Sequence, residues 1–172
     1  MYFCKPVLPS YLLAALLIFC MLLPVGAIAA PQAGQPAPEF KVVTTTGQIM
    51  SNDSFSNHVL VLDFFATWCI PCRKSIPHLV DMHRKYGKQG LQILGMSADD
   101  GEKAVNSFAS WHHVSYPLAI AGETVQTAYA IRSVPVMYII DKRGRVAAIY
   151  RGFSDETARN AERLIKKLLA ES

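Results

Sequence analysis

The chain has 172 residues, 51% of them hydrophobic, and a formal net charge of +4. This length suits one globular domain of ordinary size with a short additional segment, so no second domain is expected. The basic residues are scattered or lie in helix-like runs, and the sequence holds neither a G-x-x-x-x-G-K phosphate loop nor an internal repeat. Neither a nucleic-acid partner nor P-loop chemistry is therefore expected.

Residues 1–29 have the pattern of an export signal. Residues 11–23 are continuously apolar, and the small residues Ala27 and Ala29 resemble a cleavage site. The apolar run is shorter than the ~20 residues that usually span a bilayer, which favours a cleaved signal over an anchor. We therefore expect a periplasmic or otherwise extracytoplasmic protein. The alternative is a retained anchor in the inner membrane, formed by residues 11–30.

Cysteine usage in the remaining chain is restricted to one pair. Cys4 and Cys20 lie within the expected signal, which leaves Cys69 and Cys72. A structural disulfide is expected to stabilise the folded protein more when it closes a longer loop. A pair this close in sequence would therefore contribute little to stability. Redox chemistry or metal binding would explain the pair better than stability does.

The first predicted elements after the signal are a linker, a hairpin and a buried strand. Residues 30–38 are Pro-rich and predict an unstructured linker, followed by one domain over residues 39–172. Residues 40–50 predict two short strands around a glycine. Residues 58–66 form an almost unbroken apolar run, which is typical of a central strand buried on both faces, except for the carboxylate of Asp63.

Helices and strands then alternate along the chain. Residues 69–87 predict a helix kinked at Pro77, because its apolar period resumes beyond that residue. The further elements expected are a buried strand, a helix, a short helix, a hairpin of two strands and a final helix, over residues 91–98, 99–111, 123–131, 136–152 and 155–170. This order predicts an α/β fold with a central mixed sheet and helices on both faces.

The cysteine pair lies where the buried strand is followed by a helix. Cys69 is placed next to the free backbone N–H groups and the positive end of the helix dipole, which stabilise a thiolate. The thiolate is the species that attacks a disulfide. Cys72 lies about one turn further, within reach of the mixed disulfide. Ile70 and Pro71 set this spacing, and Pro71 fits the first helical turn because its missing N–H costs nothing there.

Taken together, these motifs resemble the thioredoxin superfamily and, within it, the exported TlpA/ResA-like disulfide reductases. The resemblance covers residues 36–169. The motif Trp68 to Cys72 matches W-C-x-P-C, Pro77 falls at the family's helix kink, and Val134-Pro135 matches its cis-proline loop. It implies a thioredoxin-like fold with an N-terminal hairpin and an insertion, holding an extra helix and strand, between the active-site helix and the cis-proline loop.

The same resemblance suggests roles for the site residues. It implies that Cys69 is the nucleophile, that Cys72 resolves the mixed disulfide, and that Pro135 is cis and packs against the pair. Trp68, Ile70, Pro71 and Val134 would contact the substrate, with the backbone of Val134 binding a peptide. The alternatives are an ordinary trans proline at position 135 and a core role for Trp68.

Asp63 is expected to be neutral or partly so near pH 7, since burial penalises its charge. It matches the buried aspartate of thioredoxin, which implies proton transfer to and from Cys72. The alternative is that the strand turns Asp63 toward water at the sheet edge. The ResA branch often carries a glutamate three residues after the second cysteine, and Ser75 stands there instead.

Other uses of two thiols fit less well. Copper-delivery proteins of this fold are characterised by C-x-x-x-C with a distant histidine, and strong oxidases by C-P-H-C, whereas this chain has C-I-P-C. Thiol peroxidases are characterised by a threonine three residues before the reactive cysteine, where this chain has Ala66. The five histidines show no metal-ligand spacing, so no metal site and no cofactor beyond the Cys69–Cys72 disulfide are expected.

A reductase of exported protein disulfides therefore fits best, with an oxidase or isomerase as the alternative. The resemblance implies a membrane electron-donor protein as partner. It suggests either apocytochrome c, in cytochrome c maturation, or exported thiols in general as targets.

Overall fold

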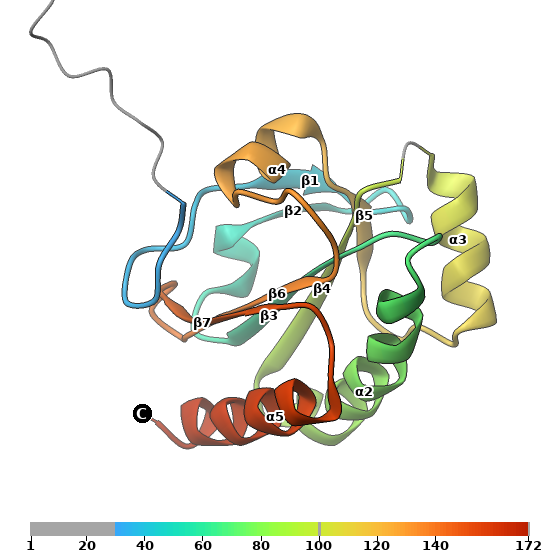
Figure 1. The fold of residues 1–172 in the computed structure, drawn as a ribbon. Coiled ribbons are helices and arrows are strands. Elements are labelled where there is room, and N and C mark those ends of the chain that lie inside the picture. The colour runs from blue at the N-terminus through green and yellow to red at the C-terminus, as the bar shows by residue number, and fades with distance from the viewer. Residues whose placement is uncertain (1–29, 100, 172) are drawn as a thin grey trace, which may run out of the picture.

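The computed structural model describes residues 30–99 and 101–171, which form a five-stranded sheet between two layers (Figure 1). The strand order is β5-β4-β3-β6-β7, and β1 and β2 form a separate hairpin. In chain order the elements are β1 Lys41–Val43, β2 Ile49–Ser51, the 3-10 helix η1 Asn52–Phe55, β3 Val59–Phe65, α2 Ile70–Tyr86, the 3-10 helix η2 Gly87–Gln89, β4 Leu91–Ser97, α3 Glu102–Trp111, β5 Leu118–Ile120, α4 Glu123–Ala128, β6 Val136–Ile140, β7 Val146–Arg151 and α5 Asp155–Ala170.

The predicted signal or anchor over residues 1–29 lies outside the described residues. In residues 30–99 and 101–171, no helix has both the length and the apolar character needed to span a membrane.

The central strand of the sheet is β3, as its unbroken apolar run predicts. All seven of its residues are buried, and it pairs parallel with β4 and antiparallel with β6. Asp63 in β3 lies opposite Gly95 in β4 and Met137 in β6. The side chain at position 63 is therefore enclosed by neighbouring strands and cannot lie at a sheet edge.

Two hydrophobic cores lie on the two faces of the sheet, as the predicted α/β fold requires. One core joins the sheet to α2, α3 and α5, and its helical members are Cys72, Ile76, Leu79, Met82, Val105, Phe108, Ala161, Ile165 and Leu168. The other joins the sheet to α4 and the hairpin through Val42, Met50, Phe55, Val125 and Tyr129. Figure 1 shows α2 and α5 side by side below the sheet, with α4 and the hairpin above it.

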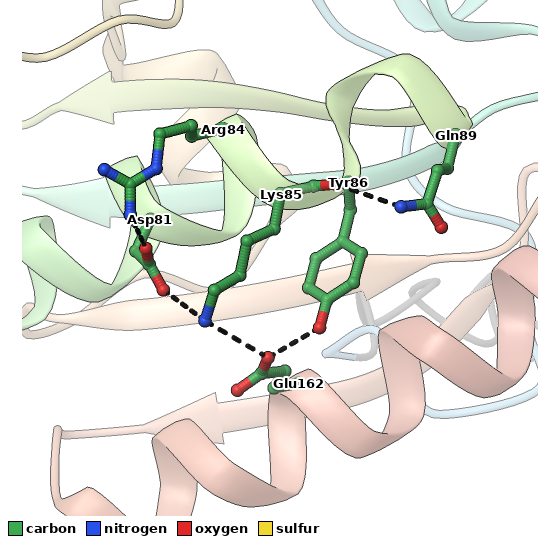
Figure 2. A network of polar contacts seen from close by, with 6 residues as sticks. All are labelled: Asp81, Arg84, Lys85, Tyr86, Gln89 and Glu162. Carbon is green, nitrogen blue, oxygen red and sulfur yellow. Dashed lines mark hydrogen bonds and ion pairs between the residues drawn. The ribbon is translucent and has the colours of Figure 1, made fainter.

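Helix α2 continues through Pro77 to Tyr86, as the resumed apolar period predicts. A polar cluster joins its last turns to α5 (Figure 2). The Tyr86 hydroxyl donates a hydrogen bond to Glu162 Oε1 at 2.7 Å, and Lys85 Nζ lies 3.9 Å from the same oxygen. Lys85 Nζ also pairs with Asp81 Oδ2 at 2.6 Å. These pairs are partly exposed, so each contributes little free energy, and the contacts of Glu162 join α2 to α5.

Three segments differ from the sequence-based expectations. The expected unstructured linker over residues 30–38 is wrong for its second half, because Gly34 N–H donates to the carbonyl of Val146 at the start of β7 and Ala37 N–H to that of Gly144 in the β6–β7 turn. Helix α3 begins at Glu102 rather than at residue 99. Strand β5 was not located from the sequence, because an element of three residues carries too little periodicity to identify.

Gly95 is the glycine whose replacement is expected to disturb the core most. A Cβ atom there would lie 2.3 Å from Leu118 Cδ2 and 3.2 Å from a ring carbon of Phe65. Gly95→Ala is expected to lower the free energy of unfolding by about 1–3 kcal/mol through overpacking, measured by urea denaturation. Gly122→Ala is the control, since a Cβ atom there meets nothing within 4 Å. Equal unfolding midpoints for the two variants would contradict this packing argument.

Candidate active site

The two cysteines lie at the start of α2, directly after the carboxyl end of β3. They form a disulfide with their Cα atoms 5.3 Å apart. Cys69 is the N-cap of α2, and its Sγ accepts a hydrogen bond from the backbone N–H of Cys72 at 3.2 Å. Cys69 is 5% exposed and Cys72 is fully buried. In the reduced protein the same N–H and the helix dipole favour a thiolate on Cys69.

The loop before β6 lies against this disulfide. The Val134–Pro135 peptide bond is cis, which confirms the isomer that the resemblance implies and excludes the trans alternative. The carbonyl oxygen of Val134 lies 3.8 Å from Cys69 Sγ. Residues 65 positions apart thus meet at the attacking sulfur, because β6 pairs with β3 and begins where β3 ends.

A hydrogen-bonded carboxylate holds the loop that precedes Cys69. The backbone N–H and the hydroxyl of Thr67 donate to Asp99 at 2.8 and 2.6 Å, and the Ser97 hydroxyl donates at 2.6 Å. Burial alone would raise the pKa of Asp99, but these bonds outweigh it and lower that pKa below its usual value. This contact was not expected from the sequence. The available signal was that β3 and β4 are parallel neighbours, so residues following them meet at one edge of the sheet.

Asp63 is buried beneath the pair, on the face of β3 that α2 and α5 cover. It is 2% exposed, and its Oδ2 atom has no hydrogen-bond partner among the described residues. Burial raises the pKa of Asp63 to about 7. The expectation of a partly neutral carboxyl is therefore confirmed, and the sheet-edge alternative is wrong.

A small cavity of about 20 Å³ adjoins Asp63 and is also lined by Ser75, His78 and Pro135. This space is sufficient for one water molecule held by polar groups. The Ser75 hydroxyl donates to the carbonyl of Cys72 at 2.9 Å, which places this residue one turn below the cysteines. His78, which is exposed on α2, lines the same cavity. The sequence alone did not indicate that His78 lies near Asp63.

Exposed apolar side chains flank the buried sulfurs. Trp68 is 68% exposed and Ile70 is 67% exposed, and Pro71 is exposed in the first turn of α2. The core alternative for Trp68 is therefore wrong. Large apolar groups around a reactive sulfur provide a surface to which a polypeptide can bind.

The described residues contain no cluster suited to a metal ion. Among residues 30–99 and 101–171, no group of three or more histidine, cysteine, aspartate or glutamate side chains could hold one. The chemistry that the geometry supports is dithiol–disulfide exchange by the cysteine pair.

Comparison with known proteins agrees with this geometry. The AhpC/TSA family model matches residues 33–149. The thiol-disulfide oxidoreductase ResA of Bacillus thuringiensis is 31% identical over 139 residues, which cover 80% of this chain and 79% of that protein. The thioredoxin-like protein YneN of Bacillus subtilis is 32% identical, covering 70% and 72% of the two chains.

A solved structure gives the same result. The thiol:disulfide interchange protein of the thioredoxin family from Chlorobium tepidum matches with a TM-score of 0.72 and 26% identity, covering 83% of this chain and all of that one. The shared fold and the geometry of the cysteine pair thus agree with the similarity in sequence. The chain therefore belongs to the AhpC/TSA family of thioredoxin-like proteins and is a thiol-disulfide oxidoreductase.

Proposed function

We propose that this protein is a reductase, which breaks disulfides in exported proteins at the cost of oxidising Cys69 and Cys72. The observation that supports this direction is the surroundings of the pair. The polar contacts of Cys69 Sγ in the described residues are the Cys72 N–H and the Val134 carbonyl, neither of which carries a cation. Strongly oxidising proteins of this kind stabilise the thiolate of their reduced form. Apolar Ile70 and Pro71 and the carboxyl of Asp63 stabilise a thiolate on Cys69 less.

Reduction would proceed in two steps. The Cys69 thiolate attacks one sulfur of the substrate disulfide, so a Cys69–substrate bond forms, the substrate S–S bond breaks, and the departing thiolate takes a proton from water. Cys72 then transfers its proton to the carboxylate of Asp63 and attacks Cys69 Sγ. The Cys69–Cys72 disulfide forms and the second substrate thiolate leaves. Two electrons pass from the cysteine pair to the substrate.

The substrate-contacting residues are assigned on the same basis. The carbonyl of Val134 is close enough to Cys69 to bind the backbone of a peptide held there, with Pro135 fixing the loop. Trp68, Ile70 and Pro71 form the exposed apolar rim on which that peptide would rest. No metal or further cofactor is needed for the exchange.

Export and partners follow from the sequence and from the relatives. The signal pattern of residues 1–29 supports an extracytoplasmic location, free or anchored through residues 11–30. An extracytoplasmic compartment is oxidising, so the pair must be reduced again by an electron donor, for which a membrane protein is the natural choice. The similarity to ResA supports cytochrome c maturation, with the cysteines of apocytochrome c as substrate, as one use.

The reduction potential of the Cys69–Cys72 couple tests the direction. Equilibration of the purified protein with a reducing dithiol is expected to give a value at or below about −230 mV, in the range of thioredoxin and glutaredoxins. The fraction of disulfide can be followed by thiol alkylation and mass measurement. A potential near about −120 mV would instead identify an oxidase or isomerase.

A further inference from the structure

A second exposed tryptophan lies beside the redox site. Trp111, in the last turn of α3, is 82% exposed. It lines the same groove as Trp68, together with Thr67, Arg73, Ser107 and His112. We call this the tryptophan groove. Its volume of about 390 Å³ can hold a large side chain and part of the adjoining backbone. Two large apolar side chains exposed on one groove indicate a binding surface rather than a core.

The residue that precedes the attacking cysteine lines the tryptophan groove. Trp68 immediately precedes Cys69, and Thr67 is held rigidly by the hydrogen bonds of its N–H and hydroxyl to Asp99. Beneath the opposite wall, Phe108 packs against Phe65 of the core with ring centroids 5.4 Å apart. Val134 and Pro135 do not line this groove, so it is a contact area separate from the cis-proline loop. A polypeptide bound at Cys69 can extend into it.

Arg73 is the cationic side chain among the residues that line the groove. Arg73 donates two hydrogen bonds to the carbonyl of Thr67, from Nε at 3.1 Å and Nη2 at 2.9 Å, which fix its guanidinium in the groove. Within residues 30–99 and 101–171, no carboxylate lies within ion-pair distance of Arg73. Burial, and then the charge of Arg73, lower the pKa of His112, so the imidazole is neutral at pH 7 and Arg73 supplies the cation.

From these contacts we infer that the tryptophan groove is a specificity subsite for the substrate polypeptide. It binds an aromatic residue near the cysteine under attack, between Trp68 and Trp111, with an acidic residue of the same segment facing Arg73. Aromatic pairs add to the free energy of apolar burial, and a carboxylate complements an otherwise unpaired guanidinium. This inference rests on the proposed exchange with protein disulfides and adds a preference for the sequence around them.

The test uses three short synthetic peptides, each with one cysteine disulfide-linked to glutathione. The first carries phenylalanine and glutamate beside the cysteine, the second replaces the phenylalanine by alanine, and the third replaces the glutamate by lysine. Release of thiol from each peptide is followed in single turnovers of the pre-reduced full-length protein below saturation. Hydroxyethyl disulfide, which is too small to reach the groove, measures the intrinsic reactivity of Cys69.

The native protein is expected to react with the first peptide about tenfold faster than with the second or third, equivalent to about 1.4 kcal/mol for each contact. Trp111→Ala should abolish the preference for phenylalanine and leave the reaction with hydroxyethyl disulfide unchanged. Arg73→Gln should abolish the preference for glutamate over lysine, compared within that variant. Ile49→Ala, at an exposed apolar position of the hairpin that does not line the groove, should preserve both preferences.

Equal rates for the three peptides with the native protein would overturn the inference. It would also be overturned if Trp111→Ala slowed hydroxyethyl disulfide and the first peptide by the same factor. The preference among peptides does not depend on the redox direction. An oxidising potential would therefore contradict the proposed reductase function but not the proposed subsite in the tryptophan groove. A reducing potential without any preference would contradict the tryptophan groove alone.

Discussion

Replacing Cys72 by serine is expected to leave the first attack intact and to stop the reaction at the mixed disulfide. Cys69 keeps its position at the N-terminus of α2 in this variant, and the hydrogen bond from the backbone N–H of residue 72 is retained. The second thiol that would release the substrate is missing. Incubation of the reduced variant with a protein disulfide should therefore accumulate a covalent adduct, which is visible on a non-reducing gel and is dissolved by dithiothreitol.

Cys69→Ser should form no adduct, and turnover should fall to background. The remaining Cys72 is fully buried and lacks an N-cap position, so it is a poor nucleophile toward external disulfides. A matched pair of variants thus separates the two roles. If Cys69→Ser trapped substrate while Cys72→Ser did not, the roles would be the reverse of those proposed.

Asp63→Asn is expected to stabilise the protein above neutral pH. The pKa of Asp63 is about 7 in the folded protein, against an ordinary value of 3.8. Between about pH 4 and 7 the unfolded chain loses this proton while the folded protein keeps it, so stability falls as pH rises through that window. The loss of folding free energy caused by the Asp63 charge is absent below this window and reaches about 4 kcal/mol above it. Removing the charge should recover up to that amount at pH 8.

Urea unfolding of the native protein and the Asp63→Asn variant at pH 4, 6 and 8 measures this effect. The free energies of unfolding should lie close together at pH 4 and diverge as pH increases. Asp53→Asn is the control, because it makes the same substitution at an exposed position of η1. A constant difference between native protein and Asp63→Asn at all three pH values would show that Asp63 has the same pKa in the folded and the unfolded chain, contrary to the raised pKa.

The same substitution should slow release of substrate more than attack on it. Asparagine cannot accept the proton of Cys72, whereas the Cys69 thiolate does not require that transfer. Stopped-flow measurement of adduct formation and decay separates the two steps. Equal slowing of both would indicate that Asp63 acts only through the local structure.

Features of the site that depend on neighbouring residues could be predicted from the sequence. The residues next to Cys69 predict a strand–helix junction, and those next to Asp63 predict a buried strand. The structure confirms both positions. The cis peptide at Pro135 came from resemblance, since a sequence does not otherwise specify the isomer. Its contact with Cys69 Sγ was also implied by that resemblance.

Contacts between distant segments that no family motif marks were not predicted. Asp99 was expected to open a helix, and instead its carboxylate is hydrogen-bonded to Thr67, 32 positions away. Trp111 was simply the last residue of a predicted helix, and only the packing of α3 against the sheet places it beside Trp68. Each of these depends on tertiary geometry that a linear pattern of apolar residues does not encode.

The attachment of residues 34–37 to the β6–β7 turn determines how the domain would be oriented on a support. Leu60 near the start of β3 pairs with Ile140 at the end of β6, so this turn lies at the end of the sheet opposite Cys69. The distance along β3 is about 20 Å. A tether joined ahead of residue 30, whether a lipid-embedded segment or an affinity tag, would hold the domain by that opposite end. The Cys69 end would then point outward, free to meet large folded proteins.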